Sequence, residues 1–386
     1  MKMFNIAVIG GAGHIGLPLS VFLQNKGNNV LVVDPNTNYV SKALKGTPPF
    51  VEKNFKPNLD QALFKGLKFT DKIENIKSKE YIIVTIGSSS NIKDIKLFNN
   101  LINEVISLAK KNSKIILRST LSPETFKTLK KNKAIKSKNL KIAYCPERIA
   151  EGLAFEELEK IPQIIGSDDK DSKIFSKFFK QNGFETLETD IDTAIFIKLF
   201  SNAYRYTSFS LINEFNNIAN SNNIDFKSVL ELATYKYDRL KDIPLPGFVG
   251  GPCLIKDTKT FIKSYEKENI LLKNFSKTNK KYLENVISQC KNKFVGKQII
   301  QLGLTFKPSS DDIRTSISLD LRKELIENGY EVFSVDPFLD QSEVDFKLFT
   351  YKEVATKTNN VLISTNHKNF ENMDFANKNV IFAGKN

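Results

Sequence analysis

The chain has 386 residues, of which 41% are hydrophobic, with three cysteines and a formal net charge of +14. This length and composition predict two or three domains with sizeable cores. No apolar run is long enough to span a membrane, and the odd number of widely spaced cysteines argues against a disulfide framework. We therefore expect a soluble cytoplasmic protein without membrane contact.

The positive charge does not by itself indicate a nucleic-acid partner. The densest stretch, residues 127–141, holds seven lysines and no acid, but it has no interleaved aromatic residue. We expect a solvated surface there and no nucleic-acid binding, although the positive field would attract a small anionic substrate. With only His14 and His367 in the chain, we expect no metal site.

In the first half, short β-branched or apolar runs alternate with helical stretches. This alternation is typical of βαβ units and predicts a parallel sheet with helices on both faces, a Rossmann-like domain over residues 1–188. The runs expected to form strands are 6–9, 30–33, 81–86, 115–117 and 142–144.

The pattern then changes to a helical stretch without Gly or Pro at 191–220, which predicts a helix long enough to bridge domains. Residues 189–292 are expected to form a central helical domain. A second α/β domain is expected at 293–386, with strands at 298–303 and 331–336. Between them, a helix over 316–328 is expected to end at Gly329. The predicted fold is thus α/β, with two Rossmann-like domains of parallel sheets joined by a long central helix and a helical middle domain.

A dinucleotide-binding fingerprint follows the first predicted strand. In the sequence Gly11-Ala12-Gly13-His14-Ile15-Gly16, we expect Gly11 to make the tight turn and Gly13 to admit a pyrophosphate. Gly16 is expected to let helix and strand pack. Asp34 ends the next strand, where its carboxylate would accept hydrogen bonds from ribose hydroxyls and repel a 2′-phosphate, which favours NAD over NADP.

A second glycine-rich segment, Pro246-Gly247-Phe248-Val249-Gly250-Gly251-Pro252-Cys253, contains a cysteine. Pro252 is a good first residue for a helix, so we expect Cys253 in a first helical turn, where the helix dipole favours thiolate. Asp257 follows one turn later. A buried structural cysteine is the alternative interpretation of these residues alone.

Taken together, the chain resembles the UDP-glucose/GDP-mannose dehydrogenase family, which oxidises the C6 alcohol of a nucleotide sugar to a carboxylate with two NAD molecules. The resemblance spans nearly the whole chain and rests on motifs in family order: 11–18, Ser119-Thr120, 145–152, Lys198 with Asn202, the Cys253 segment, and 303–308 leading to 311–314.

The resemblance implies the catalytic residues. Cys253 would be the nucleophile that holds the intermediate aldehyde. Lys198 and Asn202, four residues apart on the long helix, could both donate hydrogen bonds to the oxygen at C6. The residues that would position or activate the hydrolytic water are Thr120, Glu151 and Asp257, with Glu147 nearby.

The resemblance also implies the binding residues. Besides the fingerprint, the cofactor would contact Ile15, Thr85, Thr120, Lys256 and Arg314. The UDP-sugar would contact Glu147, Ile149, Lys198, Asn202, Arg205, Phe248, Gly250 and Lys307. The long helix also offers an apolar surface, so a homodimer is expected.

The forms of residues 202–205, 146–152 and 161–166 look more like the branch acting on N-acetylated UDP-hexosamines than the UDP-glucose branch. We therefore expect a UDP-N-acetylmannosamine or UDP-N-acetylglucosamine 6-dehydrogenase of polysaccharide biosynthesis, with UDP-glucose as the alternative substrate. Arg205 would discriminate between sugars. More distant alternatives are a two-electron hydroxyacid-type dehydrogenase, a non-catalytic NAD-binding protein and a nucleic-acid binder.

Overall fold

The computed structural model describes residues 3–87, 92–267 and 270–384. The chain separates into two compact units, Met1–Ser201 and Asn202–Asn386. The division falls inside the long helix α9, Ile191–Ser221, which confirms the helix predicted at 191–220. Each unit has its own sheet.

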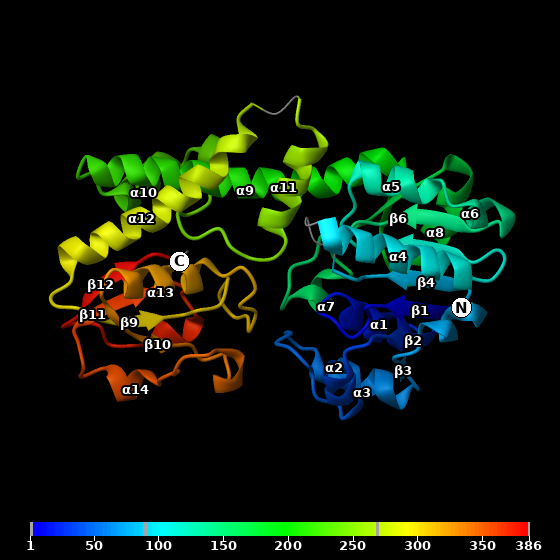
Figure 1. Cartoon of the computed structure of the whole chain (residues 1–386), viewed down its shortest axis with the longest axis horizontal. Coiled ribbons are helices and arrows are strands. Elements are labelled where there is room, and N and C mark those ends of the chain that lie inside the picture. The colour runs from blue at the N-terminus through cyan, green and yellow to red at the C-terminus, as the bar shows by residue number, and fades with distance from the viewer. Residues whose placement is uncertain (1–2, 88–91, 268–269, 385–386) are drawn as a thin grey trace. The chain divides into compact units, whose positions relative to one another are not determined.

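The first unit is built on an eight-stranded sheet in the order β3-β2-β1-β4-β5-β6-β7-β8 (Figure 1). Its neighbouring strands are parallel except β6 and β7, which pair antiparallel. All five strands predicted in this half are present. The strands are β1 Asn5–Ile9, β2 Asn29–Val33, β3 Lys68–Thr70, β4 Tyr81–Val84, β5 Lys114–Leu117, β6 Lys141–Tyr144, β7 Gln163–Ser167 and β8 Thr186–Thr189.

Helices connect successive strands of this sheet along the chain. They are α1 Gly16–Asn25, α2 Thr37–Leu44, α3 Lys56–Phe64, η1 Ile73–Ser78, α4 Ile92–Leu108, α5 Pro123–Lys130, α6 Lys133–Ser137, α7 Ala154–Glu157 and α8 Asp169–Gln181. Ile6 and Val8 of β1 belong to a core cluster with side chains of α1 and α8. Ala7 and Ile9 alternate with them and are also buried. The central strand is therefore buried on both faces, as the parallel-sheet prediction requires.

The second unit contains a four-stranded parallel sheet in the order β10-β9-β11-β12. Strands β9, Gln298–Leu302, and β10, Glu331–Val335, confirm the two predicted strands, whereas β11, Asn360–Ile363, and β12, Asn379–Phe382, were not predicted. Helix α13, Ile317–Glu327, confirms the predicted helix and ends before Gly329, which has a φ of 79°.

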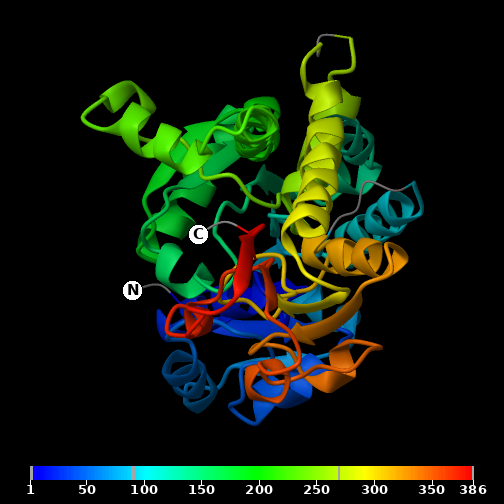
Figure 2. The ribbon, with the colours of Figure 1, turned by 90° about the vertical axis from the view of Figure 1, so that its left-hand side faces the viewer.

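The remaining helices of this unit are α10 Phe226–Thr234, η2 Asp238–Leu240, α11 Leu254–Ser264, η3 Leu272–Asn274, α12 Phe275–Lys293, η4 Gln341–Glu343, α14 Tyr351–Val354 and η5 Lys368–Phe370. Side chains of α12 and α13, among them Val286 and Leu321, form one core cluster with Ile299 of β9. Figure 2 shows α12 in yellow beside α13 in orange. Alternating β9 residues such as Ile300 face a second cluster that includes Val354 of α14.

No helix among the described residues is both long enough and apolar enough to cross a membrane.

Candidate active site

The glycine fingerprint forms the turn from β1 into α1. A Cβ atom on Gly16 would lie 2.2 Å from the Gly10 oxygen, so only glycine fits there. On Gly13 the nearest atom to such a Cβ would be the Gly10 oxygen at 3.6 Å, which leaves room beside the loop for a ligand. The left-handed φ of 73° lies at Gly10 rather than at Gly11. Gly11 is required for another reason, because its Cβ would lie 2.5 Å from the Val8 oxygen.

Asp34 follows β2, and its carboxylate holds the glycine turn by a hydrogen bond. Its Oδ2 accepts the N–H of Ala12 at 3.0 Å, and its Oδ1 accepts the N–H of Asn36 at 2.9 Å. A carboxylate offers about four acceptor positions, so about two remain here among the described residues for ribose hydroxyls. The glycine turn and this carboxylate therefore fit a dinucleotide.

Three further predicted cofactor residues also lie at the carboxyl ends of neighbouring strands or at the helix start. The Thr85 hydroxyl, after β4, is 3.0 Å from the oxygens of both Ile9 and Gly10, and so it holds the glycine turn. Thr120 follows β5 and is half-buried, and Ile15 is the N-cap of α1. This edge of a parallel sheet is where doubly wound folds bind nucleotides.

The segment after β6 carries Glu147, which is fully enclosed. Its Oε2 accepts hydrogen bonds from both Nε, at 3.0 Å, and Nη2 of Arg118. Its Oε1 accepts the N–H groups of Arg148 and Ile149 at 2.8 and 3.1 Å. Burial alone would raise the pKa of Glu147, but the Arg118 charge and these hydrogen bonds together hold the pKa below its usual range. Glu147 is therefore an ionised anchor of its own loop.

Lys198 of α9 is brought to the same segment. Its Nζ donates a hydrogen bond of 2.6 Å to the Glu147 carbonyl oxygen, and its side chain is buried. Glu151, on the same loop, is half-buried. The first unit thus groups Glu147 and Lys198 directly, with Ile149 adjoining Glu147 in the chain.

Asn202 lies one turn after Lys198 on α9 and belongs to the second unit. Its Nδ2 donates a hydrogen bond of 2.6 Å to Asp257 Oδ2, and Asp257 is completely buried. Lys256 Nζ lies 3.7 Å from the other carboxylate oxygen of Asp257. The structure therefore brings three predicted residues into one polar cluster.

Cys253 is the N-cap residue of α11, directly before its first turn. Its carbonyl oxygen accepts the N–H of Asp257 at 2.9 Å, so the predicted nucleophile and this carboxylate lie one helical turn apart. The Cys253 side chain is exposed, whereas Cys145 and Cys290 are buried. Burial raises the pKa of both buried thiols to about 12. Only Cys253 among the three combines exposure with a helix N-terminus, where thiolate is favoured.

The glycines before Cys253 meet protein rather than open space. A Cβ on Gly251, whose φ is 96°, would lie 2.7 Å from the Phe306 ring, and a Cβ on Gly250 would lie 3.0 Å from the Thr315 oxygen. At the start of the segment, Asn213 of α9 donates to the Gly247 oxygen at 2.9 Å and accepts the Gly247 N–H at 2.8 Å. The cysteine segment is thus hydrogen-bonded to α9 at its start, and its later glycines pack against the 303–316 loop.

That loop carries two of the predicted cations. Arg314 is exposed, and its guanidinium is held in a fork by the buried carboxylate of Asp312, with Nε at 2.9 Å and Nη2 at 2.6 Å. Lys307 is half-buried, with its Nζ 5.8 Å from the centre of the Phe306 ring. Arg205 lies exposed on α9, and Phe248 is buried in the core of the second unit.

Asp336 in the second unit repeats the arrangement of Asp34. Gly303 donates its N–H to the Val335 oxygen at 2.9 Å, as Gly10 does to the Val33 oxygen, and Asp336 follows β10 as Asp34 follows β2. The side chain of Asp336, however, is fully buried and receives more protein donors than Asp34, three of them on Oδ2. Its donors are the N–H groups of Leu304 (2.6 Å), Thr305 (3.3 Å) and Phe338 (2.9 Å) and Nε2 of the buried His367 (3.1 Å).

Sequence reasoning missed the residues that support this site: Arg118, Asn213, Asp312, Asp336 and His367. The recurrence of a strand, a glycine and an acid after the next strand could have indicated Asp336. Arg118, Asn213 and His367 act through tertiary contacts that leave no local pattern, whereas Asp312 lies two residues before Arg314 in the 311–314 motif.

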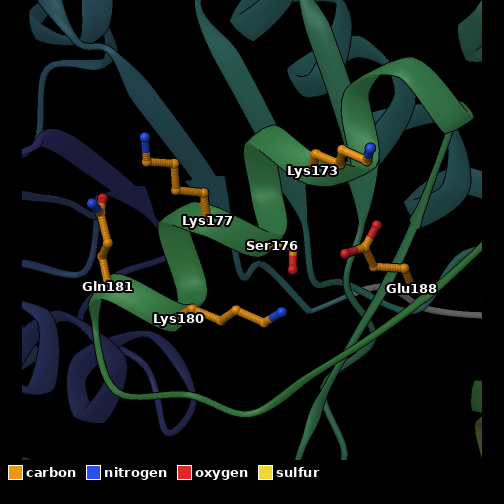
Figure 3. A pocket seen from close by; sticks show the side chains of 6 residues that line it. All are labelled: Lys173, Ser176, Lys177, Lys180, Gln181 and Glu188. Carbon is orange, nitrogen blue, oxygen red and sulfur yellow. The ribbon is translucent and has the colours of Figure 1, made fainter.

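A surface hollow of about 400 Å³ lies elsewhere on the first unit, along α8 and β8 (Figure 3). Its lining is Lys173, Ser176, Lys177, Lys180, Gln181 and Glu188. None of the predicted site residues lines it. Among the described residues, no group of three or more His, Cys, Asp or Glu could hold a metal ion.

The fold and these motifs define an NAD-dependent nucleotide-sugar dehydrogenase. The UDP-glucose/GDP-mannose dehydrogenase family matches the chain over three successive domains: its NAD binding domain at 4–182, its central domain at 192–291 and its UDP binding domain at 301–386. The chain belongs to this family, and NAD is its cofactor.

Individual relatives cover nearly the whole chain. A UDP-N-acetyl-D-mannosamine dehydrogenase of Methanocaldococcus jannaschii is 30% identical over 99% of this chain and 90% of its own length. A UDP-glucose 6-dehydrogenase of Rickettsia bellii is 28% identical over 96% of this chain and 91% of its own. The structure of a UDP-N-acetyl-mannosamine dehydrogenase from Staphylococcus aureus has a TM-score of 0.84 at 27% identity, covering 98% of this chain and 94% of that chain.

Proposed function

We propose that the protein oxidises the C6 alcohol of a UDP-N-acetylhexosamine, UDP-N-acetylmannosamine or UDP-N-acetylglucosamine, to the uronate. The observation that carries the proposal is the exposed Cys253 at the start of α11, one turn from a buried Asp257 bonded to Asn202. A two-electron alcohol dehydrogenase has no need of a nucleophilic thiol beside such a pair.

The proposed reaction proceeds in three balanced steps. The alcohol first loses a proton and a hydride and becomes an aldehyde. The Cys253 thiolate then adds to the aldehyde carbon, and the resulting thiohemiacetal alkoxide loses a second hydride to become a thioester. Water finally cleaves the carbon–sulfur bond, which releases the carboxylate and returns the thiol. The glycine turn and Asp34 would hold NAD, which would supply the hydride acceptor, two molecules for each sugar.

The chain's own residues would stabilise charge and move protons. Lys198 and Asn202 would donate hydrogen bonds to the C6 oxygen as negative charge develops on it. Asp257 would hold Asn202 in place and, with Thr120 and Glu151, orient the water that cleaves the thioester. In the nucleotide-binding loop, Lys307 would face the diphosphate, a cation-to-phosphate contact that is strengthened by charge. Arg314, oriented by Asp312, would reach the cofactor.

The choice of a hexosamine as the substrate rests on the relatives from Methanocaldococcus jannaschii and Staphylococcus aureus, both named UDP-N-acetylmannosamine dehydrogenases. The UDP-glucose 6-dehydrogenase from Rickettsia bellii covers as much of the chain at similar identity and supports UDP-glucose as the second candidate. Arg205 is our candidate for the side chain that separates these sugars.

A homodimer through α9 is part of the proposal. Apolar and aromatic side chains spaced three, four or seven residues apart share one face of this helix and are exposed: Phe196, Phe200, Tyr204, Leu211, Phe215 and Ile218. A face of this kind is typical of a protein interface. Phe215→Asp should therefore halve the mass measured by sedimentation equilibrium.

We also propose a cytoplasmic location, because a catalytic thiol must stay reduced. A role in polysaccharide biosynthesis is proposed because uronates are building blocks of polysaccharides.

The test is a count of NADH formed per sugar consumed, with purified protein and a panel of UDP-N-acetylmannosamine, UDP-N-acetylglucosamine, UDP-N-acetylgalactosamine, UDP-glucose and GDP-mannose. Two NADH per sugar with one hexosamine support the proposal, and the same stoichiometry with UDP-glucose selects the second candidate. One NADH per sugar would contradict the cysteine chemistry.

A further inference from the structure

Arg118 is a buried charge that the proposed chemistry does not use. It follows β5 directly, and its side chain is 1% exposed. Burying a guanidinium is costly unless its donors are satisfied in good geometry. Here Nε and Nη2 both bind Glu147 Oε2, Nη1 donates to Gln163 Oε1 at 2.8 Å, and the guanidinium carbon lies 6.0 Å from the centre of the Phe179 ring. Such a satisfied buried fork holds its partners in one position.

What Arg118 fixes is the peptide at Glu147. The carboxylate receives two bonds from Arg118 and two from the following N–H groups of Arg148 and Ile149. These four bonds fill the roughly four acceptor positions of a carboxylate. The side chain therefore loops back on its own backbone and fixes the direction of the residue's carbonyl group.

That carbonyl accepts a hydrogen bond from a catalytic candidate. The Glu147 oxygen receives Lys198 Nζ at 2.6 Å, and both side chains are buried. A Lys side chain has many rotamers, so its ammonium is held only where its partners are fixed. The link from Arg118 to Lys198 runs through a carboxylate and one peptide group.

We propose that Arg118 is a positioning residue for Lys198, acting through the anchored Glu147 peptide. The inference rests on the proposed function, in which Lys198 donates to the C6 oxygen. It also gives Glu147 the role of an anchor, since a carboxylate with four donors is poorly placed to exchange protons with substrate. Removing the fork should displace the Lys198 ammonium without touching the cofactor loop.

The first test is steady-state kinetics of Arg118→Lys, which keeps the charge but loses the fork. Because an oxyanion donor is typically worth at least a hundredfold in kcat, we expect its misplacement to lower kcat about tenfold or more, with KM for NAD unchanged. Gln163→Leu removes the Nη1 contact of Arg118, together with the Gln163–Ile161 hydrogen bond, but leaves both bonds to Glu147, so it should give a smaller loss in the same direction. The matched control is Lys114→Met at the other end of β5, which breaks the Lys114–Glu80 pair and should leave kcat unchanged.

The second test separates positioning from a general structural role. On a Lys198→Ala background, Arg118→Lys should lower the residual kcat little further, because the group it positions is already gone. A crystal structure of Arg118→Lys gives the readout without activity: Lys198 Nζ should have left the Glu147 oxygen. Unchanged kcat in Arg118→Lys, an undiminished further loss on the Lys198→Ala background, or a retained Lys198 contact in a slowed variant would each overturn the inference.

If the proposed function is wrong, the experiments give results different from those that would overturn the role of Arg118. A wild-type protein that turns over none of the sugars contradicts the function while the crystallographic arm still decides the link from Arg118 to Lys198. A wild-type enzyme that forms one NADH per sugar contradicts the thioester chemistry, and the kinetic arm then applies to that single oxidation.

Discussion

Asn202 Nδ2 lies 2.6 Å from Asp257 Oδ2, and it joins the long helix α9 to the first turn of α11 inside the second unit. The contact ties an expected oxyanion donor to the helix that begins just after the expected nucleophile, Cys253. The position of the amide depends on a carboxylate that is 0% exposed. The pair is therefore best regarded as one functional group.

Asp257→Asn should test the charge of this pair. The amide oxygen can still accept from Asn202, but the negative charge beside Lys256 and the capacity to act as a base are lost, so we expect kcat to fall about a hundredfold or more. NADH production under saturating sugar and NAD measures it. Asp225→Asn, which keeps the N-cap of the exposed helix α10, is the control and should retain full activity.

Cys253→Ala should abolish uronate formation, because no thiohemiacetal can form, while NAD affinity stays the same. Product analysis by mass spectrometry and NAD binding by calorimetry are the two measurements. Normal uronate production by this variant would contradict the covalent route.

Asp34→Asn should weaken NAD binding about tenfold, since a charged acceptor for ribose hydroxyls is replaced by a neutral amide. The structure supplies a matched control in Asp336→Asn, the equivalent residue of the second unit, whose fully buried carboxylate receives four protein donors. That control should lower thermal stability and leave the Kd for NAD unchanged. Calorimetric titration distinguishes the two, and a weakened NAD affinity in Asp336→Asn would show that the comparison is wrong.

The Arg118–Glu147 pair predicts a pH dependence of stability. Because the folded-state pKa of Glu147 is below its ordinary value, the pair's contribution is full above the unfolded-state pKa, about 4.3, and is lost as pH falls through the folded pKa. In Arg118→Met the charge that lowers the pKa is gone and burial raises it instead. The variant should then lose stability as pH rises through that raised pKa, the opposite direction. Melting temperatures from about pH 2.5 to 8 cover both transitions and test the sign, and parallel curves would contradict it.

Two glycines with similar backbones should differ sharply on substitution. Gly303 and Gly329 have φ values of 82° and 79°, but a Cβ on Gly303 would lie 2.1 Å from the Thr365 oxygen, whereas nothing lies within 4 Å at Gly329. Gly329→Ala should cost about 1 kcal/mol, the usual penalty of a left-handed residue. Gly303→Ala should cost clearly more, because two backbones must separate. Urea unfolding of both variants measures the difference.

The elements with strong patterns could be predicted from the sequence. The apolar strand β1, the fingerprint that follows it and the long helix α9 carry their signals within a few neighbouring residues, and the structure confirms these elements. The short exposed strands β3 and β8 carry too few apolar residues to be predicted, with none of their residues buried. Strands β11 and β12 were missed although β11 is fully buried, because a short apolar run of four residues is also compatible with a helix.

For the site, the identity of several residues could be predicted from the sequence, but their contacts could not. Cys253, Lys198 and Asn202 stand in motifs, so their residue types could be named in advance. The contacts that hold them could not, because Arg118 and Glu147 are separated by 29 residues and Asn213 and Gly247 by 34. The close approach of the glycines before Cys253 to Phe306 and Thr315 is likewise a contact between distant segments that local spacing does not indicate.

The difference between Asp34 and Asp336 has a consequence for turnover. Within the described residues, Asp34 of the first unit receives two protein donors, whereas the buried Asp336 of the second unit receives four, including His367. In the proposed reaction, a chain that binds NAD only at the Asp34 site would have to remove the two hydrides from the sugar in succession. The half-oxidised product would then have to wait while the reduced cofactor is exchanged for NAD. A bond to Cys253 would therefore serve as a tether as much as a step in the chemistry, keeping a reactive aldehyde from escaping between the two halves of the cycle.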